Sequence, residues 1–85
     1  MIAQPRDIIG IKLRVRQWED MEREFGVASS LTVGEYIPVP GHFVSGMRKF
    51  CGYLATVAST NERRFTIDLD RGKYVWTHEM FESPF

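Results

Sequence analysis

The chain is 85 residues long, which allows one domain with a small core. Its single cysteine, Cys51, excludes an internal disulfide and a zinc site built from several cysteines, and it favours a reducing, cytoplasmic location. Eleven basic and eleven acidic side chains cancel, and this neutral total disfavours nucleic acid as a partner because phosphate binding depends on positive charge.

The first predicted element is a strand from Ile8 to Arg16, which follows a loose end at residues 1–6. Apolar and polar residues alternate along it, and this is the period of a half-buried strand. The predicted inner face holds Ile9, Ile11, Leu13 and Val15. The predicted outer face is basic and holds Lys12, Arg14 and Arg16.

A short amphipathic helix is predicted next, over residues 17–25. One helical stripe holds Trp18, Met21 and Phe25. On the polar side, Glu19 and Arg23 have the i, i+4 spacing of a favourable ion pair. Gly26 then ends the helix, because glycine adopts the left-handed conformation easily.

Residues 26–42 are predicted to form a long loop, which is unusual in so small a domain unless the loop is functional. Pro38 and Pro40 push their predecessors out of the helical region, so this part of the loop must be extended. An alternative for the same segment is a short irregular strand through Leu31, Val33 and Tyr36. Helical spacing returns over residues 43–51 and predicts a second short helix, which ends at Gly52.

The remaining sequence predicts a meander of antiparallel strands with tight turns between them. The strands cover residues 53–59, 64–70 and 73–77. In the second of them the alternation predicts Phe65, Ile67 and Leu69 on the inner face and Thr66, Asp68 and Asp70 on the outer face. A single helical turn capped by Thr77 follows. Together these elements predict a mainly β (α+β) domain, built as a small barrel of about five strands with one or two short helices.

Three segments of the chain resemble small uncharacterised proteins of phages and other bacterial mobile genetic elements. They are the helix Trp18–Gly26, the run Phe43-Val44-x-x-Met47 with Cys51-Gly52 and Ala55-Thr56-Val57, and the run Trp76-x-x-Glu79-Met80-Phe81-Glu82. The resemblance covers most of the chain from Val15 onward, and residues 27–41 depart from it by being longer and richer in proline. It implies an SH3-like small barrel and no known activity.

No catalytic or metal-binding arrangement is predicted. Cys51 lies on the apolar stripe of the second helix, which favours a structural thiol over a nucleophile activated by His42 or His78. The spacing of these three residues fits no standard metal site. We therefore expect no enzyme, no metal and no cofactor. No apolar run approaches the length of a membrane span, so no membrane partner is expected.

The leading hypothesis is a non-enzymatic interaction module that binds a protein partner or a second copy of itself. The predicted binding residues come from the long loop and the last strand, and they are Tyr36, Pro38, Pro40, His42, Tyr74 and Trp76. An edge strand offers a second route, because it can pair with another chain. The alternative is a small barrel that binds nucleic acid through the basic face of Lys12, Arg14 and Arg16, although such residues also serve to prevent edge pairing.

Overall fold

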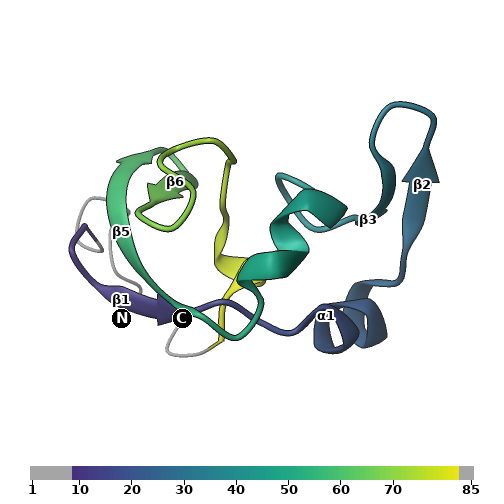
Figure 1. The fold of residues 1–85 in the computed structure, drawn as a ribbon, viewed down its shortest axis with the longest axis horizontal. Helices are drawn as coiled ribbons and strands as arrows, with labels where there is room; N and C mark the ends of the chain where they lie inside the picture. Colours follow the sequence, from purple (N-terminus) through teal and green to yellow (C-terminus); the bar gives the residue numbers. More distant parts are fainter. Residues whose placement is uncertain (1–8, 83–85) are drawn as a thin grey trace.

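The computed structural model describes residues 9–82, which form two small antiparallel sheets around one apolar core (Figure 1). Its elements, in chain order, are β1 (Lys12–Arg14), α1 (Trp18–Phe25), β2 (Ala28–Ser30), β3 (Gly34–Ile37), β4 (Phe43–Val44), the 3₁₀ helix η2 (Ser45–Phe50), β5 (Leu54–Asn61), β6 (Arg64–Ile67) and the 3₁₀ helix η3 (His78–Met80). The predicted loose end at residues 1–6 and the start of the first predicted strand at Ile8 lie outside the described residues. The mainly β, α+β class is confirmed.

The first sheet has the order β1–β5–β6. Leu13 on β1 lies opposite Ala55 on β5, and Val57 further along β5 lies opposite Ile67 on β6. All four side chains are buried, and the inward positions predicted for Leu13 and Ile67 are correct. A bulge after Val57 shifts the register to Ser59 and bends β5, as an extra residue in one strand does.

The first strand is shorter than the alternation predicts. Ile9 and Ile11 were expected on the inner face, but 51% and 41% of their surfaces are exposed. Gly10 between them has a φ of 88°, a left-handed conformation that a regular strand does not contain. The inward alternation therefore begins only at Leu13, because the backbone does not continue as a regular strand through Gly10.

The two edges of the first sheet are joined by one segment of chain. Trp76 forms a single antiparallel bridge with Phe65 on β6, and Phe81 forms one with Val15 at the end of β1. Between these bridges the chain makes the short turn η3. The predicted third strand of the meander is thus wrong as a strand, because its backbone pairing is reduced to the bridge at Trp76. Single bridges at both edges do not amount to a closed barrel.

The predicted helix is confirmed as α1. Its apolar stripe faces inward, with Trp18 and Met21 buried and Phe25 packed against the core. The predicted ion pair between Glu19 and Arg23 is replaced by two others. The Arg23 guanidinium lies 3.7 Å from the Asp20 carboxylate, and Glu19 pairs with Arg48 of η2 at 3.6 Å.

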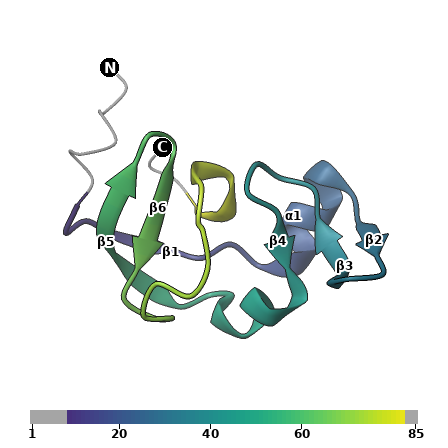
Figure 2. The same cartoon turned by 90° about the horizontal axis from the view of Figure 1, so that it is seen from above.

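The segment predicted as a long loop, residues 26–42, forms two strands instead. β2 and β3 make a hairpin, in which Ser29 lies opposite Glu35, and β4 completes a second sheet of order β2–β3–β4. Figure 2 shows this sheet beside the first one. The alternative, a strand through Leu31, Val33 and Tyr36, is correct only at Tyr36, because Leu31 and Val33 lie in the turn that precedes β3. Pro38 and Pro40 suggested a loop for the whole segment, but they lie beyond Ile37, where β3 ends.

The predicted second helix over residues 43–51 is also wrong in its first part. Phe43 and Val44 pair with β3, and only then does the chain enter the tighter helix η2. Gly46 of η2 lies against the ring hydroxyl of Tyr74, where a Cβ atom would overlap it. This close approach explains a glycine at a position that local helix propensity disfavours.

One core runs through both sheets, and Trp76 is at its centre. The Trp76 ring lies 5.9 Å from that of Phe43 on β4, 6.0 Å from that of Phe50 on η2 and 5.5 Å from that of Phe81. Trp18 of α1 extends this aromatic group through Phe43. Since the same rings contact elements of both halves, the two sheets are parts of one packed unit.

Candidate functional site

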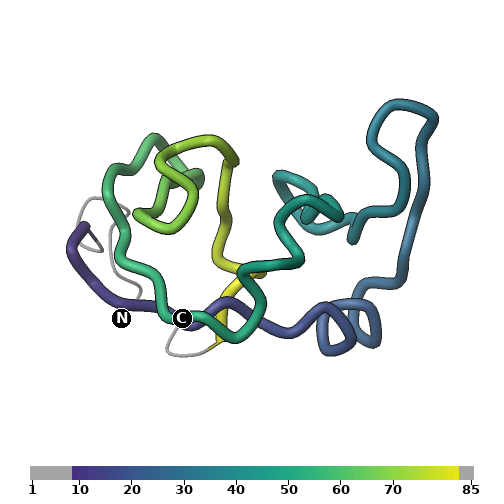
Figure 3. The backbone as a smooth tube through the Cα atoms, in the orientation of Figure 1, coloured from purple at the N-terminus to yellow at the C-terminus, as the bar shows by residue number. Residues whose placement is uncertain are grey.

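The β2–β3 hairpin stands away from the rest of the chain, as the tube in Figure 3 shows. Three apolar side chains are exposed along it. The exposed fractions are 39% for Val27, 108% for Leu31 and 44% for Val33. A single exposed leucine is ordinary on a protein surface. Three apolar residues on one projecting hairpin form a surface suited to contact with a partner.

The outer edge of β2 is unpaired within residues 9–82, because β2 is the first strand in the order β2–β3–β4. Natural edge strands are protected by short length, charge, proline or a bulge. The β2 strand, Ala28-Ser29-Ser30, is short, but it carries no charge and no proline, and its register with β3 is regular. The backbone of β2 is therefore available for pairing with another strand.

Unlike the edge of β2, both edges of the first sheet are covered by backbone hydrogen bonds. On the β1 side, the amide of Glu82 donates to the carbonyl of Arg14, and the amide of Arg16 donates to the carbonyl of Met80, both at 2.9 Å. On the β6 side, Phe65 and Trp76 exchange two backbone hydrogen bonds of 2.9 and 3.0 Å. Among the described residues, the contrast singles out β2, whose three residues have no such backbone cover and whose sheet ends on its other side in β4, with only two residues.

The predicted loop residues form the base of the hairpin. The rings of Tyr36 and His42 stack with their centroids 4.7 Å apart. Pro38 and Pro40 are exposed, while Ile37 before them and Val39 between them point into the core. This alternation holds the segment from residue 36 to residue 42 against the body of the protein.

A turn at residues 39–42 makes this base rigid. The His42 amide donates to the Val39 carbonyl at 2.8 Å, and Gly41 has a φ of 84°, as the third position of a type II turn after Pro40 requires. The hydroxyl of Thr77 donates to the Pro40 carbonyl at 2.7 Å. Thr77 does begin η3 as predicted, but its hydroxyl fixes this turn rather than capping the helix.

The aromatic residues of the last predicted strand are turned toward the core. Trp76 is 0% exposed, so its assignment to the partner surface was wrong, and the residue belongs to the core. Tyr74 is half-buried and packs against the core, with the Lys73 ammonium 5.3 Å from its ring centroid. The large aromatic residues of this segment are needed inside because so small a domain has few others to fill its core.

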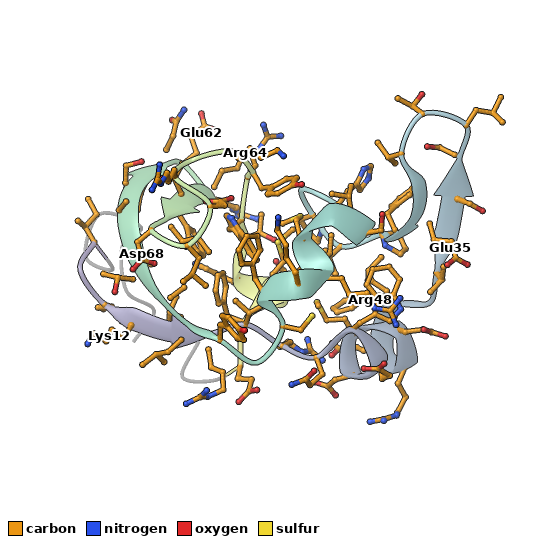
Figure 4. The ribbon with its side chains drawn as sticks, viewed as in Figure 1. Lys12, Glu35, Arg48, Glu62, Arg64 and Asp68 are labelled. Carbon is orange, nitrogen blue, oxygen red and sulfur yellow. The ribbon has the colours of Figure 1, made fainter. Side chains whose placement is uncertain are left out.

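A groove separates the turn at residues 39–42 from the β5–β6 turn, with a cavity volume of about 670 Å³. It is lined by Pro40, Gly41, Glu62, Arg63, Arg64 and Thr77. Figure 4 shows Glu62 and Arg64 together at the tip of the β5–β6 hairpin. The groove thus brings predicted Pro40 near Arg63 and Arg64, but its charges are of both signs and select no partner.

The predicted basic face of the first strand is divided by the fold. Lys12 and Arg14 are exposed, and Arg14 donates to the Gly52 carbonyl at 2.8 Å. Arg16 is turned inward and bonds Asp20 at 2.9 Å and Glu24 at 2.7 Å. Burial by itself would lower the pKa of the Arg16 guanidinium. The hydrogen bonds to Glu24 and Asp20 outweigh the burial, and the pKa is raised. Arg16 is therefore a neutralised structural cation, and its assignment to a phosphate-binding face was wrong.

A second cleft, with a volume of about 460 Å³, contains Arg16 and carboxylates from α1 and from the chain after Thr77. Its lining residues are Arg16, Asp20, Glu24, Phe25, His78, Glu79, Phe81 and Glu82. Two of these carboxylates already bond Arg16. Among residues 9–82, no three His, Cys, Asp or Glu side chains are grouped closely enough to hold a metal ion.

Cys51 and the two histidines lie in separate structural settings. Cys51 is half-buried against the core, and burial raises the pKa of its thiol, an effect to which the nearby Glu19 adds. His42 stacks on Tyr36, and the His78 ring lies 5.9 Å from that of Phe65. A thiol with a raised pKa is mostly protonated near neutral pH, which is the opposite of what an activated nucleophile needs.

The exposed apolar residues of the hairpin were missed as a site, although the sequence contains a signal for them. No charged residue occurs between Glu24 and Glu35. Such an uncharged run on a projecting hairpin is compatible with contact to another chain.

None of the helices in the described part of the chain is long and apolar enough to cross a membrane. Comparisons with protein-family models, with curated proteins and with solved structures give no match to this chain. The geometry of the β2–β3 hairpin is therefore the strongest guide to function.

Proposed function

We propose that this chain is a non-enzymatic protein-binding module that recognises its partner through the β2–β3 hairpin. The observation that carries the proposal is the unprotected edge of β2 beside the fully exposed Leu31. An added strand satisfies the free backbone groups of such an edge, while side-chain contacts provide selectivity. Tyr36 and His42 support the hairpin at its base, and the turn at Pro40 holds that base in place.

The proposal includes an SH3-like small barrel as the scaffold. Its support is the order of backbone contacts around the first sheet, in which the segment from Trp76 to Phe81 touches both edges. A barrel requires contact of this kind between its first and last strands. Origin in a mobile genetic element rests on the sequence resemblance, and a cytoplasmic location rests on the single cysteine.

Nucleic-acid binding is the alternative proposal. It retains Lys12 and Arg14 on the exposed face of β1, together with Arg63 and Arg64 at the turn between β5 and β6. It loses Arg16, whose charge is already neutralised. Binding by the remaining cations would weaken steeply as salt concentration rises, because counterions compete for the phosphates.

The test is affinity capture from a bacterial lysate with and without nuclease. The bait is compared with a Leu31→Asp variant, which places a charge on the hairpin. Leu54→Asp is the matched control, because Leu54 is also exposed but lies on β5 of the other sheet.

We expect proteins that survive nuclease treatment, are retained by the control and are lost with Leu31→Asp. Capture that disappears with nuclease would move the assignment to the basic residues. Equal capture by both variants would exclude the hairpin as the binding site.

A further inference from the structure

We infer that the hairpin's partner is a second copy of this chain, with β2 pairing antiparallel to β2 of the copy about a two-fold axis. The inference rests on the proposed function, because it names the partner of the same hairpin. It would join the two β2–β3–β4 sheets into one continuous sheet and leave no free β2 edge. Closed two-fold dimers of this kind use one surface twice.

The β2 sequence is complementary to itself in this arrangement. If Ser29 lies on the two-fold axis, Ala28 faces Ser30 of the second copy, and Val27 faces Leu31 of the second copy. Val27 and Leu31 flank β2, and Leu31 begins the turn to β3. Where pairing with the copy extends β2 by one residue at each end, residues 27, 29 and 31 share one face of the joined strands, because side chains alternate between faces. Leu31, the most exposed large apolar side chain among residues 9–82, is thus placed opposite another exposed apolar side chain from the same hairpin.

Charge does not oppose the pairing. β2 carries no charged residue, so no like charges face each other across the axis. The nearest charge in the sheet is Glu35, which lies opposite Ser29 on β3. In the joined sheet the two Glu35 residues are separated by three strand spacings, about 14 Å. This exceeds the screening length of about 8 Å at physiological salt.

The position of β2 leaves room for the second copy. In Figure 1, β2 lies at the outer margin of the molecule, with no other described segment beyond it. Edge strands of different proteins can recognise each other through complementary charges, and the uncharged β2 has no charge for such recognition. Pairing with a second copy does not require complementary charges, because the two-fold symmetry repeats every contact.

The first experiment is sedimentation equilibrium of the whole chain over a wide concentration range. The contact area is small, so we expect a reversible dimer, with the average mass rising from the 9.9 kDa monomer toward twice that value. Leu31→Asp should remain monomeric because the added carboxylate would face Val27 of the second copy. Leu54→Asp should dimerise like the original protein. A chain that stays monomeric, or a Leu31→Asp variant that dimerises equally, would overturn the inference.

The second experiment tests the register by cross-linking. Ser29→Cys is introduced with Cys51→Ser, so that the new thiol is the single one. Opposite residues of antiparallel strands have Cα atoms about 4.5–5.5 Å apart, within the range that a disulfide spans. Mild oxidation should link Ser29→Cys into a dimer much faster than Ser45→Cys, whose exposed position on η2 is the matched control. Equal rates would exclude this register.

The two proposals fail in distinguishable ways. A monomeric chain whose capture of another protein still depends on Leu31 would overturn the dimer and leave the proposed function standing. A monomeric chain with no Leu31-dependent capture would overturn both. Circular dichroism of each variant establishes that it is folded before either comparison is made.

Discussion

At the scale of single residues, Asp70 organises the chain that follows β6. Its carboxylate accepts hydrogen bonds from the Gly72 amide at 3.1 Å, the Tyr74 amide at 2.8 Å and the indole nitrogen of Trp76 at 2.9 Å. The sequence pattern predicted Asp70 on the outer face of a strand. Its actual role could not be read from alternation, because it depends on a turn that brings Trp76 back to it.

The first prediction concerns this carboxylate. Asp70→Ala should lower the free energy of unfolding by about 2–3 kcal/mol, because the indole N–H of buried Trp76 loses its acceptor. Asp70→Asn retains one acceptor oxygen and should recover part of the loss. Urea unfolding followed by tryptophan fluorescence measures both values. A loss below about 0.5 kcal/mol for the alanine variant would show that the bonds contribute little.

The second prediction concerns the thiol of Cys51, whose pKa is raised by burial. Below its pKa in the folded protein, Cys51 should react with iodoacetamide more slowly than the thiol of the unfolded chain at the same pH. A raised pKa also means that folding favours the protonated form. The associated stability is therefore complete below the unfolded pKa of about 8.5 and is lost as the pH rises through the higher folded value.

The comparison for Cys51 is the labelling rate across pH 7 to 10, approximately the titration range of a thiol, with and without denaturant. Equal rates at every pH would contradict the prediction. Faster labelling of the native protein near neutral pH would instead indicate an activated cysteine and reopen the question of catalysis.

At the scale of elements, one tight turn sets the path of the chain after β6. The turn after β6 joins Asp70 to Lys73, whose amide donates to the Asp70 carbonyl at 3.1 Å. Arg71 and Gly72 at its centre have φ values of 55° and 79°, the signature of a type I′ turn. Glycine suits this conformation, but arginine is strained in it because its Cβ atom crowds the backbone.

The third prediction follows from that strain. Arg71→Asn should raise the free energy of unfolding by about 0.5–1 kcal/mol, because asparagine tolerates the left-handed region better than arginine does. Lys73→Asn changes an exposed basic residue of the same turn that has no left-handed φ, and it should give no increase. Urea unfolding of the two variants measures the difference. A gain shared by both would point to charge rather than to backbone conformation.

At the scale of the whole molecule, the sequence predicted the elements that depend on the spacing of neighbouring residues. It missed the elements that depend on pairing with other parts of the chain. The stripe of α1 and the inward face of β6 depend on spacing alone, and both are present. The β2–β3 hairpin has weak local signals, because its outward residues are apolar and its inward residues few. β3 is recognisable only through its pairing with β2 and β4.

The candidate site was also predicted only in part. Tyr36, Pro38, Pro40 and His42 were placed in an exposed functional segment, and they form the base of the hairpin. Trp76 was misplaced because aromatic residues occur both at interfaces and in cores, and composition does not separate the two cases. Only the contacts of its ring with Phe43 and Phe81 assign it to the core.

The segment that joins both edges of the first sheet has a consequence for synthesis on the ribosome. Val15, directly after β1, is bridged to Phe81, 66 positions later in the chain (81 − 15). A nascent chain can form α1 and the hairpins as they emerge from the exit tunnel. It cannot cover the β1 edge until Phe81 has also emerged. During that interval the exposed strand is open to chaperones and to neighbouring nascent chains on the same messenger RNA.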